Sequence, residues 1–594
     1  MTQSTVSTLL WVMRTSRPKL KTLRSGQMLT TPYSSQTARE AKTDAVHYSL
    51  LQHEYGGTSF TERERDEIGL RGLLPPTFQS LDQQLARTKQ QMKMTTTPFE
   101  KHIALSNLRQ RNERLFYYYV LNNLRETLPL VYTPVVGEAC QNFSRIFRRA
   151  EGLNISLLDK GRVKECVSNW PRPADMPRVA VVTDGSRILG LGDLGWNGLG
   201  ICIGKLSLYV AGAGIDPEST VPIVIDTGTN NEELLDDPLY LGLRRKRATS
   251  SEVIALVDEV MEALNSKYPN LIVQFEDWST DHAFLFLERY QHKYPMFNDD
   301  IQGTGAVILG GFINAARLGS SASGRALEDQ RILFVGAGSA AIGVAKQLMS
   351  FFTLHGIPDD EARKRIWTTD SRGLVTKSRG DKLAAHKEFF ARDDNGDFES
   401  SDLLEIVNHV KPTALVGLCT VPSTFDERVL RRMAELNKRP IVCPLSNPTA
   451  NAECTFQEAL DWTNGSVIFA AGSPFDDIEF QGKLRVADQG NNFYIFPGIG
   501  LAGALSKAKH LTDNVIREAA MALADSMTQP EKDEGRIYPI LERTREVSAY
   551  IAARCIRVID KEGFARGDIP FAKMDDDELL AWIKEHMWYP SYDN

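Results

Sequence analysis

The chain has 594 residues, of which 42% are hydrophobic and 24% charged, values typical of a folded globular protein with about four structural units. Its formal net charge of −7 provides no basic field for a nucleic-acid backbone. No apolar run approaches the ~20 residues that a membrane-spanning helix needs. We therefore expect neither nucleic acid nor a membrane as a partner. The seven cysteines contain no CxxC pair and indicate reduced thiols.

Residues 1–39 differ from the rest of the chain in composition. They contain no Asp or Glu, many Ser and Thr, and six basic residues: Arg14, Arg17, Lys19, Lys21, Arg24 and Arg39. This composition is typical of an organellar transit peptide. We predict a mitochondrial matrix enzyme; the alternative is a disordered tail on a cytoplasmic protein.

The chain that follows changes from helical to alternating patterns. Before Met176 the pattern is mostly helical, with one helix predicted over Lys101–Arg125 that ends before Pro129. After Met176, short β-branched runs alternate with helical stretches, which predicts an α/β fold with largely parallel sheets. The predicted strands are Val179–Thr183, Val221–Asp226, Leu271–Phe275, Arg331–Val335, Ile366–Thr369, Ala414–Gly417, Ile441–Leu445 and Val467–Ala470.

A first glycine-rich segment, Gly190-Leu-Gly-Asp-Leu-Gly195, matches the spacing of a dinucleotide-binding turn. It continues as Trp196-Asn-Gly-Leu-Gly200, which is too glycine-rich for a regular helix start. No strand ending in an acid follows at the expected position. We interpret it as a close-packed loop that positions polar groups.

Acidic residues follow two predicted strands. Glu276 and Asp277 come after Leu271–Phe275, and Asn298, Asp299 and Asp300 end a second apolar segment. Carboxylates grouped without His or Cys suit Mg²⁺ or Mn²⁺ and not zinc. The alternative is that these acids cap the helices predicted after them, over 281–290 and 301–318. Spacing alone leaves both interpretations open.

A second glycine turn has the full context of a Rossmann dinucleotide site. A buried strand precedes it, a helix over 344–352 follows it, and Asp370 ends the next strand, where it can accept from the adenine ribose. The predicted cofactor residues of the turn are Gly336, Gly338, Ser339, Ala340, Ala341 and Gly343.

The residues that follow this strand give divided indications about whether NAD or NADP is bound. Asp370 favours NAD, because a carboxylate repels a 2′-phosphate. Ser371 and Arg372 follow it directly, and further cations are available to hold a phosphate: Lys377, Arg379, Lys382 and Lys387. A solvated basic loop is the alternative. We predict that both nucleotides are accepted.

Six segments resemble those of the malic enzymes, in the order in which that family has them. They are Val131-Tyr-Thr-Pro-Val-Val-Gly-Glu, Thr183-Asp-Gly-Ser-Arg-Ile-Leu-Gly-Leu-Gly-Asp-Leu-Gly, Gln274-Phe-Glu-Asp, Phe297-Asn-Asp-Asp-Ile-Gln-Gly-Thr, Leu445-Ser-Asn-Pro-Thr and Gln489-Gly-Asn-Asn-Phe-Tyr-Ile-Phe-Pro-Gly. The likeness runs from about Gly69 to beyond His510, which is most of the chain.

The resemblance implies oxidative decarboxylation of L-malate to pyruvate and CO₂, with NAD or NADP reduced and Mg²⁺ or Mn²⁺ required. The alternatives are a malolactic variant that releases lactate and a catalytically dead nucleotide-binding scaffold. The family also implies a homo-oligomer, a tetramer or dimer. The expected organisation is a transit peptide (1–39), a helical region (40–175), an α/β substrate and metal domain (176–298), a Rossmann-type domain (299–490) and a return segment with C-terminal helices (491–594).

By the same resemblance, Glu276, Asp277 and Asp300 are the metal ligands. Lys205 is the base that takes the C2 hydroxyl proton, for which its pKa must be lowered, and Asp299 competes for this role. Tyr132 protonates C3 of enolpyruvate, as a phenol of ordinary pKa.

The remaining residues that the resemblance implies bind substrate, nucleotide or an activator. Arg187 holds a substrate carboxylate. Asn447 and Asn491 supply substrate amides, with Asn492 beside them, and Asn447 also lies near the cofactor. Lys387 aligns with a lysine of NADP-using members. Arg87 and Arg111 align with arginines that bind an activating dicarboxylate in some members.

Overall fold

The computed structural model describes residues 57–67, 69–447, 449–567 and 569–592, so the predicted transit peptide lies outside the described residues. The chain divides into two compact units, 1–80 and 81–594. The described part of the first contains a short turn, η1 (Gly57–Ser59), and α4 (Glu62–Glu67). There the buried Arg65 side chain donates to the carbonyl oxygens of Phe60 and Pro75, each at 2.7 Å.

The second unit begins with a group of helices. They are α5 (Leu81–Met92), α6 (Pro98–Arg111), α7 (Glu113–Asn122), α8 (Leu124–Val131), α9 (Val135–Gln141) and α10 (Phe143–Ile146). The prediction of one helix over 101–125 is wrong, because Asn112 and Asn123 interrupt it, and the Asn112 side chain caps α7. The expected end before Pro129 is also wrong. Pro129 lies inside α8, which begins only at Leu124. Because proline has no N–H, the helix lacks one hydrogen bond there, and it still continues to Val131.

A five-stranded parallel sheet follows, with the strand order β1-β3-β2-β4-β5. Its strands are β1 (Leu153–Ser156), β2 (Val179–Thr183), β3 (Thr220–Asp226), β4 (Ile272–Phe275) and β5 (Met296–Asn298). The predicted strands in this region are confirmed to within one residue. The sequence pattern does not predict β1, which pairs with β3 from within the region expected to be helical.

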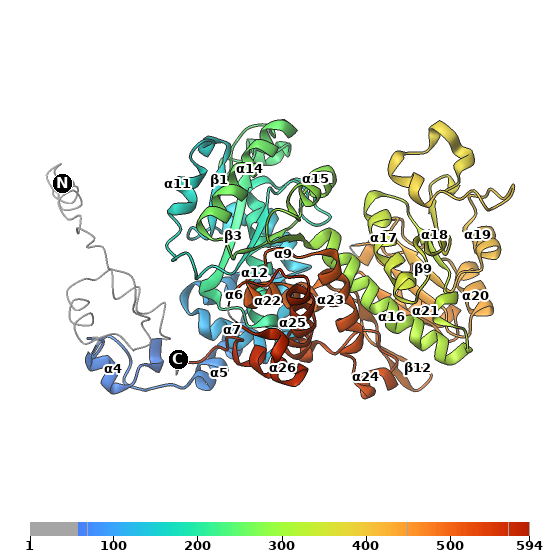
Figure 1. Ribbon diagram of the computed structural model, residues 1–594. Helices are drawn as coiled ribbons and strands as arrows, with labels where there is room; N and C mark the ends of the chain where they lie inside the picture. Colours follow the sequence, from blue (N-terminus) through green and yellow to red (C-terminus); the bar gives the residue numbers. More distant parts are fainter. Residues whose placement is uncertain (1–56, 68, 448, 568, 593–594) are drawn as a thin grey trace. The chain divides into compact units, whose positions relative to one another are not determined.

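Both faces of this sheet are buried, as parallel sheets require. Ala180 and Val182 share a core with α11 (Val163–Ser168), α14 (Ser250–Lys267) and α15 (Thr280–Tyr290). Val179 and Val181 point to the other face, which α12 (Leu199–Ala213) covers. In Figure 1, α22 (Phe496–Ser506) and α25 (Thr544–Lys561) lie beside α12, so the C-terminal part of the chain returns to this sheet.

The second sheet has seven strands in the order β14-β11-β10-β9-β6-β7-β8, all parallel except for the β7–β8 pair. The strands are β6 (Ile332–Val335), β7 (Ile366–Asp370), β8 (Gly373–Leu374), β9 (Ala414–Gly417), β10 (Ile441–Pro444), β11 (Ile468–Ala471) and β14 (Asp488–Gln489). The predicted strands here are also confirmed. Because β7 and β9 lie on opposite sides of β6, the strand order reverses at β6, where α/β sheets bind ligands.

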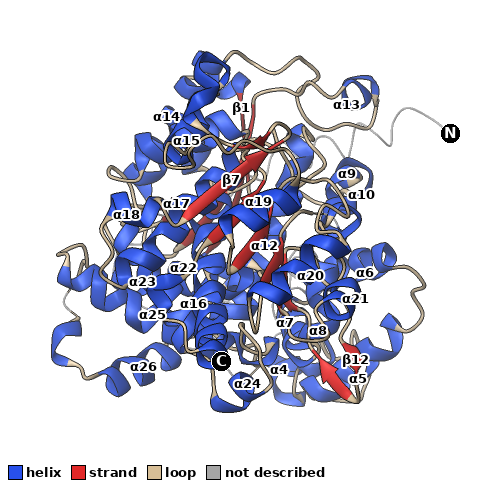
Figure 2. Cartoon of the chain, turned by 90° about the vertical axis from the view of Figure 1, so that its right-hand side faces the viewer, coloured by secondary structure: helices blue, strands red, loops and turns tan. Residues whose placement is uncertain are grey.

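Helices cover both faces of the second sheet, and Figure 2 shows the strands enclosed by them. One face carries α16 (Thr304–Ser323) and α17 (Ser339–Leu354), the other α19 (Leu403–Val410), α20 (Glu427–Leu436) and α21 (Phe456–Trp462), while α23 (Asp513–Asp525) packs on α16. The remaining elements are α13 (Glu232–Asp236), α18 (Asp359–Arg363), α24 (Gln529–Asp533), α26 (Asp576–Glu585) and the antiparallel pair β12 (Ile478–Phe480) and β13 (Lys483–Arg485). The α/β fold class is confirmed.

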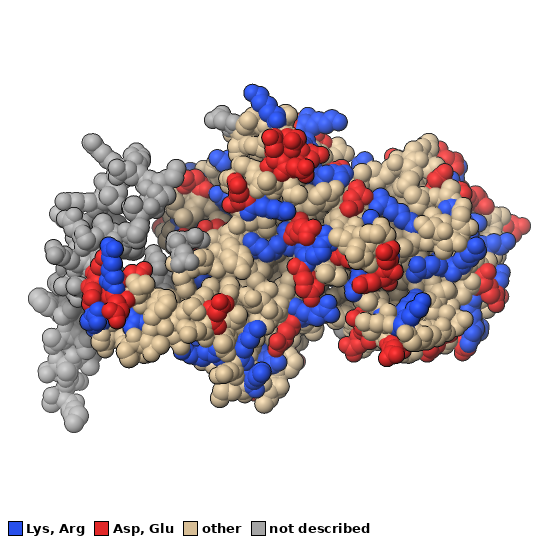
Figure 3. Space-filling model, turned by 90° about the horizontal axis from the view of Figure 1, so that it is seen from below, with Lys and Arg blue, Asp and Glu red and all other residues tan. Residues whose placement is uncertain are grey.

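Three general expectations can be compared with the described residues. None of their helices has the length and apolar character to cross a bilayer. Basic and acidic side chains are interspersed over the face shown in Figure 3. All seven cysteines are free, and four of them are buried.

Candidate active site

The predicted acidic cluster forms where β4 and β5 end side by side. Glu276 and Asp277 follow β4, while Asp300 lies in the π-helical turn η5 (Asp299–Gly303) after β5. Each of the three offers a carboxylate oxygen, and these oxygens lie within 4.8 Å of one another. Other residues occupy the N-cap positions of the elements that follow: Ser279 for α15, and Asn298, whose side chain accepts from the Ile301 N–H, for η5. Helix capping is therefore not what these acids do.

Burial shapes the charge of the cluster. It raises the pKa of Glu276 and Asp277 well above the ordinary range and that of Asp300 to about 6, with the neighbouring acids adding to the effect. Asp277 Oδ2 and Asp299 Oδ1 are buried without a hydrogen-bond partner among the described residues. Uncompensated buried carboxylate oxygens are costly. A divalent cation with oxygen ligands fits this donor set.

Lys205 projects from the middle of α12 with 0% of its surface exposed. Its Nζ lies 2.5 Å from Asp299 Oδ2 and 3.0 Å from Glu276 Oε1. Burial by itself lowers the pKa of Lys205, but the two carboxylates outweigh it and hold this pKa well above the ordinary value. The predicted lowering is therefore wrong for the side chains as they stand, because the acids lie closer than the sequence could indicate.

Tyr132 lies at the end of α8, with the centre of its ring 4.9 Å from Lys205 Nζ. Phe496 faces the same ammonium group, with its ring centre at 4.5 Å. Burial raises the pKa of Tyr132, although Lys205 opposes the shift. The expectation of an ordinary pKa is wrong, and the phenol stays protonated at neutral pH.

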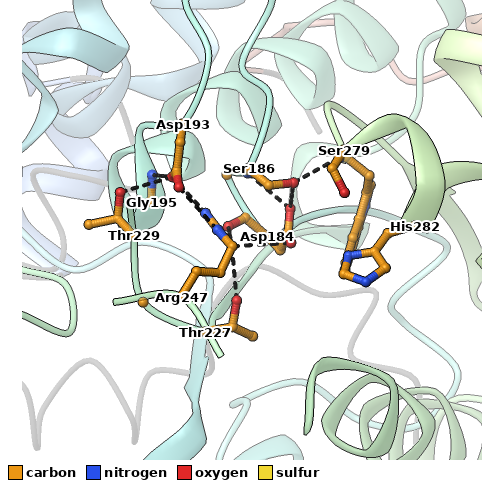
Figure 4. A network of polar contacts seen from close by, with 12 residues as sticks. Asp184, Ser186, Asp193, Gly195, Thr227, Thr229, Arg247, Ser279 and His282 are labelled. Atoms are coloured by element: carbon orange, nitrogen blue, oxygen red, sulfur yellow. Dashed lines mark hydrogen bonds and ion pairs between the residues drawn. The ribbon is translucent and has the colours of Figure 1, made fainter. Parts of the chain in front are cut away.

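The first glycine-rich loop is close-packed at its ends and not at its tip. A Cβ on Gly185 would lie 1.9 Å from the Gly195 carbonyl oxygen, and one on Gly195 would lie 2.2 Å from the Tyr240 hydroxyl. At the tip, a Cβ on Gly192 would meet nothing within 4 Å. Figure 4 shows that Arg247 joins this loop through Asp184 and Asp193. The loop thus positions polar groups, as predicted.

Arg187 lies in the same loop with an exposed side chain, and its Nη1 donates to Thr280 Oγ1 at 2.7 Å. Its backbone N–H donates to the Asp277 carbonyl oxygen at 3.3 Å. The structure thus brings the predicted substrate arginine next to the acidic cluster.

The three predicted amide residues have different surroundings. Asn492 is joined to the cluster, because its Nδ2 donates to Asp299 Oδ2 at 3.1 Å. Asn491 is buried, and its side chain accepts from the Phe493 N–H at 2.9 Å. Asn447 is exposed after β10 and accepts from Ser473 Oγ at 2.6 Å. Only Asn492 is hydrogen-bonded to the acids.

The second glycine turn lies at the end of β6, at the reversal of the strand order. Gly336 has φ +118°, and a Cβ there would lie 2.5 Å from the Leu418 carbonyl oxygen. A Cβ on Gly338 would meet nothing within 4 Å. Ser339 and Ala340 start α17, and Ala341 and Gly343 lie in its next residues. The turn therefore leaves backbone and a helix N-terminus open to an anionic ligand.

Asp370 ends β7 as predicted, but its carboxylate is already engaged. It accepts from Arg379 Nη1 at 2.9 Å, from Lys387 Nζ at 2.6 Å and from the Arg372 N–H at 2.9 Å. Burial opposes the effect, but these hydrogen bonds lower the pKa of Asp370. Ser371 and the Arg372 side chain are exposed beside it. The sequence predicts Arg379 only as one of several basic residues in this loop, whereas the structure shows it bound to Asp370.

Arg87 and Arg111 lie elsewhere. Arg87 is on α5 and Arg111 is the last residue of α6, and both side chains are exposed. Neither helix carries a residue of the acidic cluster.

Two residues at the site were missed from the sequence. Gln274 donates to Glu276 Oε2 at 2.7 Å and accepts from Tyr209 Oη at 2.5 Å. Its place in the Gln274-Phe-Glu-Asp segment was an available signal. Arg247 lies 54 residues from Asp193 in the chain, and no local pattern marks it.

Two family models match most of the second unit. The model "Malic enzyme, N-terminal domain" matches residues 109–291, and "Malic enzyme, NAD binding domain" matches residues 301–559. The chain is 48% identical to an NADP-dependent malic enzyme of Dictyostelium discoideum, covering 90% of this chain and 96% of that protein. It is 44% identical to a chloroplastic NADP-dependent malic enzyme of Flaveria trinervia, covering 92% and 83%.

A solved structure supports the fold. The malic enzyme of Entamoeba histolytica matches with a TM-score of 0.53 at 21% identity, covering 88% of this chain and 91% of that one.

The predicted mitochondrial matrix location is wrong. The relatives from Flaveria trinervia, Flaveria pringlei and Oryza sativa are named chloroplastic, which contradicts it. The physical reason is that mitochondrial and chloroplast transit peptides share an Arg- and Ser-rich, acid-poor composition, so composition does not distinguish the two organelles.

The identity and coverage of these matches exceed what a shared fold alone requires, and they favour neither lactate release nor a catalytically dead scaffold. The chain therefore belongs to the malic enzyme family and is an oxidoreductase that decarboxylates malate with a nicotinamide dinucleotide and a divalent metal.

Proposed function

We propose that this malic enzyme prefers NADP⁺ and holds Mg²⁺ or Mn²⁺ with Glu276, Asp277 and Asp300. The observation that supports the metal site is the buried group of carboxylates, in which Asp277 Oδ2 has no hydrogen-bond partner among the described residues. A divalent cation bound there supplies Lewis-acid polarisation of the substrate's C2 oxygen.

Lys205 and Asp299 act together as the base. With 2.5 Å between Lys205 Nζ and Asp299 Oδ2, a proton can pass from one to the other without movement of the chain. Lys205 gives its proton to Asp299 and takes that of the C2 hydroxyl as hydride leaves C2. This order is needed because the two acids hold the lysine in its charged form.

Tyr132 supplies the proton that enolpyruvate needs at C3 after CO₂ has left. Its raised pKa keeps the phenol protonated until that step, and the nearby Lys205 stabilises the phenolate that remains. Arg187 holds a carboxylate of malate with its planar fork of donors. Asn491 and Asn447 contact the substrate, and Asn492 orients Asp299.

The preference for NADP⁺ follows from the state of Asp370. Its carboxylate is bound by Arg379 and Lys387, so its repulsion of a 2′-phosphate is offset by two cations that can turn to the phosphate. The relatives from Dictyostelium and Flaveria are named NADP-dependent, which supports the same choice.

The location is proposed from the names of the relatives, and the subunit number from the family resemblance. A plastid or cytosolic location is favoured by the chloroplastic relatives, and imaging of a fluorescent fusion of the full chain tests it. We also propose a homo-oligomer, a dimer or tetramer, which light scattering of the purified protein measures.

The decisive assay supplies L-malate and Mn²⁺ with NAD⁺ or NADP⁺ in parallel. We expect pyruvate and reduced nucleotide in equal amounts, with the higher kcat/KM for NADP⁺. Lactate without reduced nucleotide would contradict the reaction, and a higher kcat/KM for NAD⁺ would contradict the preference.

The metal site is tested by Asp300→Asn, which keeps the shape of the side chain and removes its charge. We expect kcat/KM for malate to fall at least about 100-fold, because metal sites lose this much even through outer partners, with partial recovery at high Mn²⁺. Asp281→Asn in the first turn of α15, an exposed acid nearby, is the matched control and should leave turnover unchanged. Wild-type turnover of Asp300→Asn at low Mn²⁺ would remove Asp300 from the ligand set.

The two proton-transfer roles are separated by substrate. Lys205→Ala should lose reduction of added pyruvate, in which C2 receives the hydride and the C2 oxygen needs a proton, whereas Tyr132→Phe should keep it and lose about 100-fold in malate oxidation and oxaloacetate decarboxylation. Tyr119→Phe, at another buried tyrosine, is the control. Normal pyruvate reduction by Lys205→Ala would assign the base role to Asp299 alone.

A further inference from the structure

Asp277 has a left-handed backbone conformation, which is uncommon for residues with a side chain although aspartate adopts it more readily than most. Its φ is +54°, in the left-handed region, where a residue with a Cβ is disfavoured by about 1 kcal/mol or more. Two hydrogen bonds hold its peptide groups: its N–H donates to Asp300 Oδ2 at 2.7 Å, and its carbonyl accepts from the Arg187 N–H at 3.3 Å. Such a conformation persists only where the surrounding structure enforces it.

The Ser186 hydroxyl gives a third connection to the same segment. Ser186 Oγ accepts from the Ser279 N–H at 2.7 Å and donates to Asp184 Oδ1 at 2.5 Å. One hydroxyl thus ties the chain just after Asp277 to the loop that carries Arg187. Figure 4 shows Ser186 between Ser279 and Asp184.

Arg247 binds Asp184, the residue that accepts the hydrogen bond of the Ser186 hydroxyl. Its Nη1 donates to Asp184 Oδ2 and to the Asp184 carbonyl oxygen, each at 3.2 Å, and to Thr227 Oγ1 at 2.9 Å. Its Nη2 and Nε donate to the two oxygens of Asp193 at 2.6 and 3.1 Å. Because the Asp184 side chain is fully buried, this guanidinium is the cation that balances it. Only an arginine has donors in the fixed fork needed to span both carboxylates.

We propose that Arg247 and Ser186 are positioning residues of the divalent-cation site. The chain of hydrogen bonds Arg247–Asp184–Ser186–Ser279 holds Asp277 in its left-handed conformation and so keeps its free carboxylate oxygen directed at the cation. Neither residue is among the ligands, and the inference rests on the ligand set proposed above. Outer partners of this kind tune metal affinity because they fix the direction of the ligands.

The test is a calorimetric titration of the full-length protein with Mn²⁺ in the absence of substrate. Ser186→Ala removes the hydroxyl that joins the two segments, and we expect the Kd for Mn²⁺ to rise about tenfold. The Kd for NADP⁺, measured on the same sample, should be unchanged, since the glycine turn at Gly338 is on the other sheet. Ser250→Ala is the matched control, because Ser250 Oγ bonds to His282 Nε2 at 2.9 Å and is outside the chain of hydrogen bonds.

Arg247→Lys gives a second measurement, since an ammonium group lacks the planar fork with which Arg247 donates to Asp184, Thr227 and both oxygens of Asp193. We expect a similar rise in the Kd for Mn²⁺, whereas Arg289→Lys, at the bidentate pair with Asp258, should leave it unchanged. If Arg247→Lys does not fold, the serine variant decides.

The possible results distinguish a failure of the proposed positioning role from a failure of the proposed metal ligands. A wild-type Kd for Mn²⁺ in Ser186→Ala overturns the proposal, and so does an equal loss of affinity for Mn²⁺ and NADP⁺, which would indicate general loosening. A wild-type Kd in Asp300→Asn would overturn the ligand set and the connection with it. Loss in Asp300→Asn with a wild-type Kd in Ser186→Ala would overturn the connection alone.

Discussion

The two glycine-rich turns have nearly the same spacing but opposite roles. In the first, a short 3₁₀ turn (η3, Gly195–Gly198) comes before α12, and Asp193 is bound by Arg247 from a distant part of the chain. In the second, α17 begins at Ser339, directly after Gly338. The first turn is completed by side chains of its own protein, and the second leaves its helix N-terminus available to a ligand.

The tips of the two turns do not differ. A Cβ on Gly190 or Gly192 would meet nothing within 4 Å, and neither would one on Gly338. What differs is the chain that follows and the partner that fills the turn. A glycine pattern therefore reports a backbone able to approach something closely, and the surrounding chain decides whether that is a ligand or another segment.

The largest effect is expected at the closed end of the first turn. Gly185→Ala puts a Cβ 1.9 Å from the Gly195 carbonyl oxygen at φ +68°, and two backbone segments cannot move apart without disturbing both. We expect the free energy of unfolding to fall by about 3–5 kcal/mol, measured by urea denaturation. Gly192→Ala also has a positive φ, +83°, but open space, and should cost only about 1 kcal/mol of strain. Equal losses would mean that close packing does not distinguish the two positions.

A substitution in the second turn should weaken the binding of NADP⁺ and leave the free energy of unfolding almost unchanged. Gly338 has φ −70°, and a Cβ there meets no atom within 4 Å, so Gly338→Ala should change the free energy of unfolding by less than about 0.5 kcal/mol. We expect the KM for NADP⁺ to rise about tenfold, because the pyrophosphate approaches the second glycine of such a turn. The KM for malate serves as the internal control. A large loss of stability would show that this turn is filled by the protein as the first one is.

The smallest change in stability is expected at Asp370, which Arg379 and Lys387 bind as Arg247 binds Asp193 in the first turn. A lowered pKa means that Asp370 stabilises the fold at pH above its ordinary value and that this stabilisation is lost as the pH falls through the lowered pKa. Asp370→Asn should therefore lower the free energy of unfolding by about 1 kcal/mol at pH 7, with the difference shrinking below about pH 4.

The same variant frees Arg379 and Lys387, so the KM for NADP⁺ should fall while that for NAD⁺ rises. Asp393→Asn, at the exposed pair with Lys377, is the control for a lost ion pair outside the nucleotide region. An unchanged ratio of the two KM values would show that Asp370 does not read the 2′ position.

Short sequence patterns were sufficient to predict most of the strands of the fold. β-Branched runs placed the strands of both sheets, because a buried parallel strand needs a short continuous apolar stretch whatever lies beside it. The acids after β4 and β5 were candidates because polar residues that follow apolar segments indicate the carboxyl edge of a sheet, but only the family resemblance favoured metal binding over helix capping. The break at Asn112 and the strand β1 were missed, because capping and edge pairing depend on neighbours that a helical or apolar pattern does not specify.

The sequence was sufficient to predict the strands of both sheets and the glycine turn after β6, because each of them is a short local pattern, whereas the ligand role of Glu276, Asp277 and Asp300 rests on the family resemblance. The charge states and ion-pair partners of the site residues could be known only from the packed structure. Lys205 is held protonated by Asp299 and Glu276, Asp370 is bound by Arg379 and Lys387, and Asp184 is balanced by Arg247. Charge and pKa depend on distances of a few ångströms between groups far apart in sequence or across a loop, and only the packed fold sets those distances.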